Sequence, residues 1–132
     1  MALEPFARDH YNLTRKGIFG MTKRTPIKGL LSWKSQPIMT PLTTACKEDA
    51  ELGVESLITF RIIMGYMGDR LAQDENIIIL KGLQARLMKG SEEYIDEVFC
   101  QVCKQTTLNP RVNSDIRGWR LLLSILAVVL PS

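Results

Sequence analysis

Apolar residues recur every three or four positions through most of residues 49–130, and this spacing limits the fold more than any other feature. One such band consists of Val54, Leu57, Ile58, Phe60, Ile62 and Met64. The spacing places side chains on one face of an α-helix. No segment shows the sustained apolar–polar alternation of a half-buried strand. The sequence therefore predicts an all-α fold, a compact helical bundle.

Capping residues and chain breakers set the limits of the first two helices in this region. The first helix begins near Asp49 and ends at Gly68, because glycine readily adopts the left-handed cap conformation. The second runs from Asp74 to Lys89. The β-branched residues Ile77–Ile79 could instead form a strand, but the leucines that follow restore helical spacing.

The two later helices also have clear limits. Ser91 can cap a free amide, and the carboxylates of Glu92 and Glu93 favour the positive end of the helix dipole. We expect this helix to fade near Thr107, before an Asn-Pro pair breaks the chain. The last helix is predicted over residues 114–130, ahead of a proline.

The first 48 residues differ in character. Leu3–Tyr11 can form a short helix, whereas residues 12–47 mix proline and glycine with basic and hydroxyl residues and are expected to be mostly loop, with a helical turn at Lys28–Trp33. This segment holds too many apolar residues for a free linker, so we expect it to pack on the bundle. The chain of 132 residues fits a single domain of about five to six helices.

Charge is unevenly distributed, although the formal net charge is only +3. Residues 1–48 hold eight Lys and Arg against three acidic residues, residues 49–100 hold five against ten, and residues 101–132 hold four against one. A basic surface attracts an acidic partner such as a cytoskeletal polymer, a nucleic acid or an anionic membrane, although a solvated surface without a partner explains the charge equally well. The candidate partner-binding residues are Lys23, Arg24, Lys28, Lys104, Arg111 and Arg120.

Cysteine and histidine content offers little for catalysis or metal binding. Cys100 and Cys103 form a Cys-x-x-Cys pair, and Cys46 with His10 could on paper complete four zinc ligands. Two small apolar residues on one helix face explain the pair as well. A single histidine builds no nucleophile–base pair, and no phosphate-binding glycine loop is present. We therefore expect no enzyme activity, no catalytic residue, no metal and no cofactor.

Location can also be predicted from the sequence. Three cysteines form a sparse, odd set that suits a reducing compartment. The longest apolar run, residues 121–130, would span about half of a bilayer core as a helix, so no transmembrane segment is expected. The N-terminal residues lack the features of a secretory signal. These observations favour the cytoplasm.

Several motifs occur together along the chain. The run Cys-Gln-x-x-Lys-Gln-x-Thr-x-Asn-Pro at residues 100–110 is followed by Arg117-Gly118-Trp119. Two further motifs lie upstream, at residues 25–31 and at Met64–Asp69. Together these motifs resemble the myosin tail homology 4 (MyTH4) domain, and the likeness covers nearly the whole chain.

The resemblance implies a non-enzymatic helical module of an unconventional myosin tail. Such a module stands beside a FERM domain and binds cargo proteins or microtubules at the cytoskeleton. The alternative is the same module in a plant-type kinesin, a pleckstrin-homology protein or a Rho GTPase-activating protein, acting in targeting or regulation. Binding of nucleic acid is disfavoured, since the last helix is too apolar to be a recognition helix.

The resemblance also assigns structural roles to a signature. Its members are Glu97, Gln101, Gln105, Asn109, Arg117, Gly118 and Trp119, and Lys104 matches it too. Polar groups at a helix–turn–helix junction are expected to satisfy one another, because each one left buried and unpaired costs about 1–3 kcal/mol. Arg117 could pair with Glu97 or another acid, and Trp119 is expected to anchor the core. Because the family pattern continues past Ser132, we expect a C-terminally truncated domain with an exposed apolar patch on the last helix.

Overall fold

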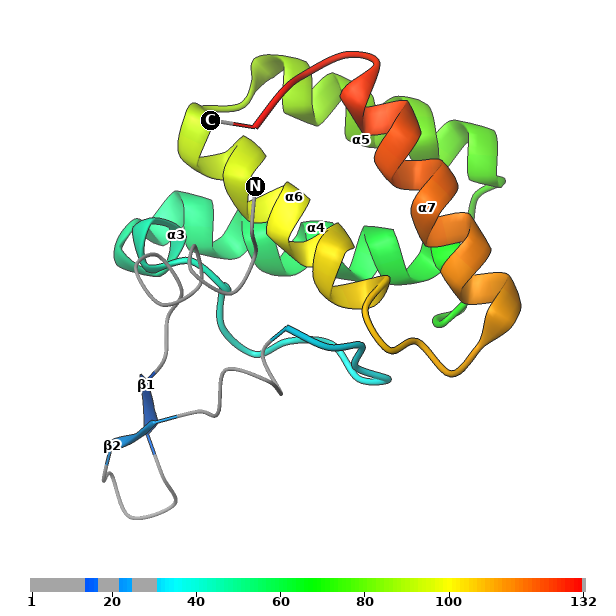
Figure 1. The fold of residues 1–132 in the computed structure, drawn as a ribbon. Helices are drawn as coiled ribbons and strands as arrows, with labels where there is room; N and C mark the ends of the chain where they lie inside the picture. The colour runs from blue at the N-terminus through cyan, green and yellow to red at the C-terminus, as the bar shows by residue number, and fades with distance from the viewer. Residues whose placement is uncertain (1–13, 17–21, 25–30, 132) are drawn as a thin grey trace.

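A computed structural model describes residues 14–16, 22–24 and 31–131, and these residues form five helices and one pair of short strands (Figure 1). The helices are α3 (Thr44–Glu48), α4 (Ala50–Met67), α5 (Asn76–Lys89), α6 (Glu92–Gln105) and α7 (Val112–Leu126). The predicted all-α bundle of five to six helices is confirmed. The helix expected at Leu3–Tyr11 lies outside the described residues.

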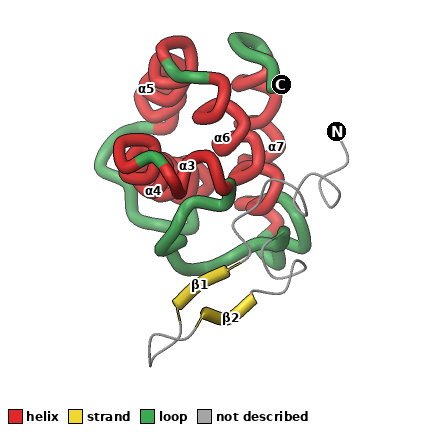
Figure 2. The backbone as a smooth tube through the Cα atoms, turned by 90° about the vertical axis from the view of Figure 1, so that its left-hand side faces the viewer, coloured by secondary structure: helices red, strands yellow, loops and turns green. Residues whose placement is uncertain are grey.

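Two strands of three residues each, β1 (Thr14–Lys16) and β2 (Thr22–Arg24), lie in the segment expected to be loop. They pair antiparallel, with Thr14 opposite Arg24 (Figure 2). Strands this short carry no apolar alternation that a sequence could reveal, so they were missed.

The predicted helix limits are confirmed at most capping residues. Asp49 caps α4, because its Oδ1 accepts hydrogen bonds from Glu51 N and Leu52 N, both at 3.0 Å. Gly68 closes α4 in the left-handed conformation, with a φ of 82°. Ser91 caps α6, and its Oγ accepts a 3.3 Å hydrogen bond from Tyr94 N.

The structure differs from the predicted helices in three places, and in the first α5 begins at Asn76 rather than at Asp74. α7 begins at Val112 rather than at residue 114, because Asn109 Oδ1 accepts a 2.9 Å hydrogen bond from Arg111 N and turns the chain directly into the helix. Its regular part ends at Leu126, four residues earlier than predicted. The short helix α3 was not predicted, since its five residues are too few to show an apolar period.

α4 lies at the centre of the bundle and contacts the other four helices (Figure 1). The main core combines side chains from α4, α5, α6 and α7, namely Ile63, Met67, Leu83, Leu87, Tyr94, Val98, Phe99, Val102, Leu121 and Ile125. A second cluster packs Ile38 and Leu42 against Phe60, Met64 and Cys100. This second cluster fastens the segment before α3 to α4 and α6, so the prediction that this apolar loop packs on the bundle holds for its described part.

The close packing around Gly118 explains why the Arg-Gly-Trp motif needs a glycine. A Cβ at this position would lie 2.6 Å from Thr106 Cγ2 and 2.7 Å from Met67 Cε. The missing side chain lets α7 approach the ends of α4 and α6 closely. The buried face of α7 runs through Ser114, Gly118, Leu121 and Ile125, at helical spacing.

The outer face of α7 carries several exposed apolar side chains. Trp119 is 51% exposed, Leu123 69% and Leu130, just beyond the helix, 75%. The expected apolar patch is therefore confirmed, but the prediction that Trp119 anchors the core is wrong. Trp119 lies one position, or about 100°, around the helix from the buried Gly118, and so it faces outward. None of the helices in the described part of the chain is long and apolar enough to cross a membrane.

Candidate protein-interaction site

Four polar residues of α6 lie on one buried face of the helix, whereas Glu92 and Glu93 in its first turn are exposed. Glu97, Gln101, Lys104 and Gln105 follow one another at steps of four, three and one, and all four are at most 3% exposed. The segment 31–43 covers them, and their polar atoms bond chiefly to its backbone. The side chains of this polar face therefore bond to backbone groups of a segment that has no regular secondary structure of its own.

Glu97 is the most heavily bonded group on this face. One carboxylate oxygen accepts hydrogen bonds from Thr43 N at 2.8 Å and Thr43 Oγ1 at 2.9 Å. The other accepts from Leu42 N at 3.1 Å and Gln101 Nε2 at 2.8 Å. Burial raises the pKa of Glu97 above its ordinary value, and the hydrogen bonds from Thr43, Gln101 and Leu42 oppose that rise.

Gln105 and Lys104 hold the same segment further along. Gln105 Oε1 accepts from Lys34 N and its Nε2 donates to Lys34 O, both at 3.0 Å, so the amide pairs with a backbone as a neighbouring strand would. Lys104 Nζ donates a 2.7 Å hydrogen bond to Ser32 O. The interpretation of Lys104 as part of a basic surface is wrong, because its side chain is 3% exposed and serves the fold.

Replacing Lys104 by methionine is expected to flatten the pH dependence of stability above pH 8. Burial, with a smaller contribution from the charge of Lys34, lowers the pKa of Lys104 from 10.5 to about 8. The Lys104 amine therefore binds its proton more tightly in the unfolded chain than in the folded protein. As pH rises from about 8 to 10.5, the free energy of unfolding increases, by about 3 kcal/mol for a pKa shift of this size. Urea unfolding of both proteins at several pH values measures the difference between their free energies of unfolding. Titrating groups that the two proteins share cancel in this difference. A constant difference would contradict the prediction.

Asp69 is the centre of a second polar cluster, at the point where α4, α7 and the segment before α3 meet. Its Oδ2 accepts from Ser114 Oγ at 2.7 Å and from Trp33 Nε1 at 3.1 Å. Its Oδ1 forms a 3.2 Å ion pair with Arg111 Nη1. The Asp69 side chain is fully buried, whereas that of Arg111 is 53% exposed and lies 5.3 Å over the Trp33 ring. We call Trp33, Asp69, Arg111 and Ser114 the Asp69 cluster.

Asn109 connects this cluster to α6. Its Nδ2 donates to Gln105 O at 3.1 Å and to Ser114 Oγ at 2.8 Å. The Gln105–Ser114 connection is thus a hydrogen-bonded junction between α6 and α7. Only the Met64–Asp69 motif signalled Asp69 in the sequence, and neither Trp33 nor Ser114 was singled out.

Arg117 does not pair with Glu97. Its Nη1 donates a long hydrogen bond of 3.5 Å to Met67 O, and the guanidinium occupies the space where a Cβ of residue 68 would lie. Glu97 is buried on α6 beneath Leu42 and Thr43. Arg117 therefore acts at the end of α4, beside a cavity of about 390 Å³ that Asp69 and Arg111 also line.

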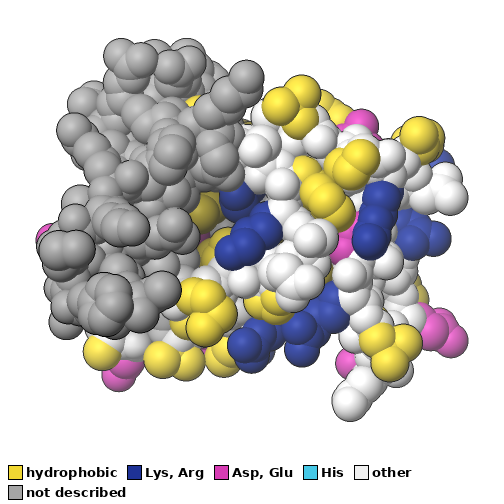
Figure 3. All heavy atoms as spheres, turned by 90° about the horizontal axis from the view of Figure 1, so that it is seen from below, with side chains coloured by type: hydrophobic (Ala, Val, Ile, Leu, Met, Phe, Trp, Pro, Cys, Tyr) yellow, Lys and Arg dark blue, Asp and Glu magenta, His cyan; other side chains and the backbone are white. Residues whose placement is uncertain are grey.

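The six candidate basic residues do not form one patch in the part of the chain that is described. Arg120 is exposed on α7 and Arg111 directly before it, but nine positions separate them, which corresponds to about 13 Å along a helix axis and about half a turn around it. Lys23 and Arg24 lie in β2, where only the backbone is described, and Lys28 lies outside the described residues. Figure 3 shows Lys and Arg side chains in several separate groups across one face of the bundle.

The cysteines lie apart from any recognisable metal centre. Cys46 and Cys100 are buried and Cys103 is partly buried. Burial raises the pKa of Cys46 and Cys103, which keeps both thiols protonated at neutral pH. No group of three or more potential metal ligands gathers among the residues described, and His10 lies outside them.

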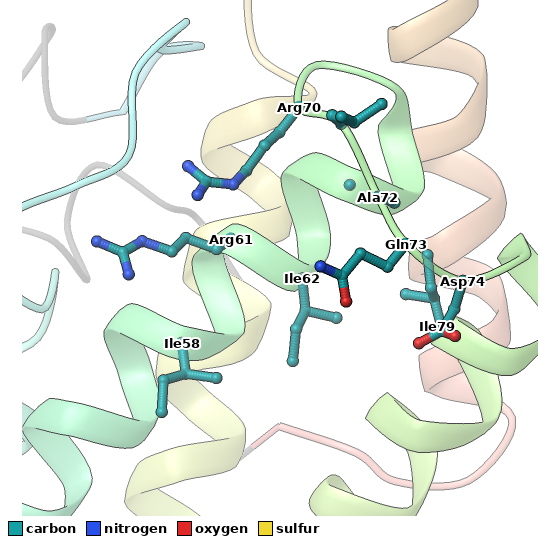
Figure 4. Close-up of a pocket in the computed structure, with 10 residues that line it drawn as sticks. Ile58, Arg61, Ile62, Arg70, Ala72, Gln73, Asp74 and Ile79 are labelled. Carbon is teal, nitrogen blue, oxygen red and sulfur yellow. The ribbon is translucent and has the colours of Figure 1, made fainter.

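A groove on the opposite side of α4 from α6 was not anticipated. It measures about 440 Å³ and lies between α4, the α4–α5 connection and the start of α5 (Figure 4). Ile58, Ile62 and Ile79 contribute apolar lining, while Arg61 and Arg70 contribute positive charge. The two arginines lie nine positions apart in different elements, so no sequence pattern linked them.

Comparisons with known proteins give a consistent result. The model of the MyTH4 domain family matches residues 84–132. The high molecular weight form of myosin-1 from Acanthamoeba castellanii is 35% identical over 79% of this chain. The kinesin-like protein KIN-14I from Oryza sativa subsp. japonica is 32% identical over 80% of it. The chain spans only 6% of the length of the myosin and 8% of that of the kinesin-like protein.

A solved structure extends the likeness to nearly all of the chain. It is that of the human Myosin 7b C-terminal MyTH4-FERM domain in complex with the harmonin-a PDZ3 domain. The match has a TM-score of 0.79 at 26% identity and covers 98% of this chain and 25% of that one. The resemblance drawn from the motifs at residues 100–119 is therefore confirmed by sequence and by fold.

Proposed function

Since this chain belongs to the MyTH4 domain family, we propose that it is a non-catalytic interaction module of an unconventional myosin tail, which binds cargo proteins together with an adjacent FERM domain. The family match at residues 84–132 carries the proposal. The similarity to a MyTH4-FERM structure in complex with a PDZ domain supports it. The chain spans only 6% of the Acanthamoeba castellanii myosin, so the proposal concerns this domain and not a whole protein. We also propose that the module is located in the cytoplasm, at the cytoskeleton.

The contacts of the signature residues support a scaffolding role. Glu97, Gln105 and Asn109 bond to the backbone or side chains of this chain, and in doing so they fix the loop and the α6–α7 junction. A scaffold of this kind holds its exposed surfaces in constant positions, as partner recognition requires. The proposed module includes no metal and no cofactor.

Deleting residues 31–131 from the full-length parent protein tests this function. Quantitative mass spectrometry would compare the proteins that copurify with the intact and deleted forms. We expect at least one partner protein to be lost with the deletion and to bind the purified chain directly. Identical partners for both forms would contradict the proposal.

We propose microtubules as a second class of partner, because the chain carries several candidate basic residues. An acidic polymer would be attracted by basic residues, of which Arg120 is exposed on α7, and salt would screen the interaction. The double variant Arg24→Glu/Arg120→Glu should then lower co-sedimentation with microtubules at low salt. Lys81→Glu/Lys89→Glu on α5 introduces the same charge change as a control, and equal loss in both variants would contradict a specific site.

The same module in a kinesin-like protein is the alternative, which the rice relative favours. The two readings predict the same fold and the same surfaces. The sequence of the motor domain in the parent protein distinguishes them.

A further inference from the structure

We propose that the groove between α4 and the α4–α5 connection binds a short peptide segment of a partner protein, in which an acidic side chain lies beside branched aliphatic side chains. This inference rests on the proposed function, because it names the partner chemistry of one surface of the module. The groove belongs neither to the polar face of α6 nor to the Asp69 cluster.

The floor of the groove is apolar and open. Ile58 and Ile62 lie one helical turn apart on α4, and Ile79 at the start of α5 lines the same groove (Figure 4). Ile58 is 38% exposed, and Leu71 at the rim is 96% exposed. Large aliphatic side chains that remain this exposed gain free energy when an apolar partner covers them. A volume of about 440 Å³ accommodates a few side chains of a peptide.

The wall of the groove is held in place by two contacts. A Cβ on Gly65 would lie 3.3 Å from Ala72 Cβ, so the glycine lets the α4–α5 connection pack directly on α4. Asn76 Nδ2 donates a 3.4 Å hydrogen bond to Tyr66 O and ties the start of α5 to the same helix. The groove is therefore formed before a ligand arrives, which lowers the entropic cost of binding.

Two arginines give the groove its charge preference. Arg61 comes from α4 and Arg70 from the connection, and Figure 4 shows both side chains extending to the same side. Neither forms an ion pair with a described residue, in contrast to Arg86, which pairs with Glu55, and Arg111, which pairs with Asp69. Asp74 also lines the groove and lies away from the two guanidinium groups in Figure 4. An acidic group at the arginine end would complete two charge-assisted hydrogen bonds.

An acidic, aliphatic peptide fits both halves of the site. A nucleic acid or a free phosphate would meet the arginines but leave the isoleucines uncovered. A purely apolar peptide would cover the isoleucines but leave two guanidinium groups without a partner.

Binding of defined peptides to the 132-residue chain tests the proposal. The probe is acetyl-Asp-Glu-Leu-Ile-Leu-amide, and its comparison peptides replace either the two acids by Asn-Gln or the three aliphatic residues by Ser-Gly-Ser. Amide shifts in a ¹⁵N spectrum report the location, and their dependence on peptide concentration reports the dissociation constant. We expect the acidic aliphatic peptide to shift residues 58–79 and to bind about tenfold more tightly than either comparison peptide.

The variant Arg61→Ala/Arg70→Ala should weaken binding of the same peptide by about tenfold or more while unfolding as the native chain does. Lys89→Ala/Arg120→Ala removes two positive charges elsewhere and should leave binding unchanged. Equal affinity for the Asn-Gln peptide, shifts outside the groove, equal loss in both variants or no binding would each overturn the proposal.

The same variant separates failure of the groove from failure of the module. If deletion of residues 31–131 removes a partner that the Arg61→Ala/Arg70→Ala protein retains, the groove proposal is overturned and the proposed function stands. If the peptide binds in the groove but deletion removes no partner, the proposed function is overturned and the site stands.

Discussion

Replacing Glu97 by alanine is expected to lower the free energy of unfolding by about 4 kcal/mol, the largest effect of any single polar substitution that we anticipate in this chain. The carboxylate accepts four hydrogen bonds, from Leu42 N, Thr43 N, Thr43 Oγ1 and Gln101 Nε2. Removing it leaves these four buried donors without an acceptor. Because native domains are stable by only about 5–15 kcal/mol, the variant should be close to unfolding.

Urea unfolding at pH 7 followed by circular dichroism measures this loss. Glu93→Ala provides a matched control on the same helix, because Glu93 is exposed in its first turn and should cost about 0.5 kcal/mol through the helix dipole. Glu97→Gln retains one carbonyl oxygen and should fall between the two. A loss below about 1 kcal/mol for Glu97→Ala would show that water or a shifted loop satisfies the donors.

Local features of the helices could be predicted from the sequence because their causes lie within a few residues. Asp49 and Ser91 cap amides two or three positions away, and Gly68 adopts the backbone conformation that glycine tolerates best. The identities of these residues are enough to place the helix ends. The apolar spacing of α4 and α6 follows from the same geometry.

The partners of the signature residues could not be predicted in the same way. Glu97 bonds to Thr43, 54 positions earlier, and Trp33 bonds to Asp69, 36 positions later. Such pairs depend on how an irregular loop crosses two helices, and no periodicity encodes that path. The motif indicated that Glu97 matters, but only the structure shows that Glu97 bonds to the loop before α3 and not to Arg117.

Whether a charged or aromatic side chain is buried or exposed was also difficult to predict. Lys104 and Arg120 carry the same charge in the sequence, yet Lys104 is buried beneath Ser32 and Arg120 is exposed. Trp119 is large and apolar, yet it faces outward because Gly118 takes the buried position beside Met67. In both cases the neighbour across the interface decides the outcome, and that neighbour is distant in sequence.

Asp69→Ala is expected to destabilise the domain by about 3 kcal/mol and to release the segment around Trp33 from the α6–α7 junction. The buried carboxylate binds Ser114 Oγ, Trp33 Nε1 and Arg111. The hydroxyl and the indole lose their acceptor inside the protein, whereas Arg111 is half-exposed and can return to water. The expected loss is therefore smaller than for Glu97, where all four donors face the interior.

Tryptophan fluorescence separates this mechanism from a general loss of stability. In a Trp119→Phe background the emission comes from Trp33, and Asp69→Ala should shift it to longer wavelength in the folded protein, because the freed indole meets water. Asp74→Ala in the neighbouring connection removes an exposed carboxylate and should change stability by no more than about 0.5 kcal/mol. If Asp69→Ala lowers stability while the Trp33 emission stays unchanged, the backbone hydrogen bond from Trp33 N to Thr107 O is sufficient to hold the loop, and the Asp69 cluster stabilises α7 alone.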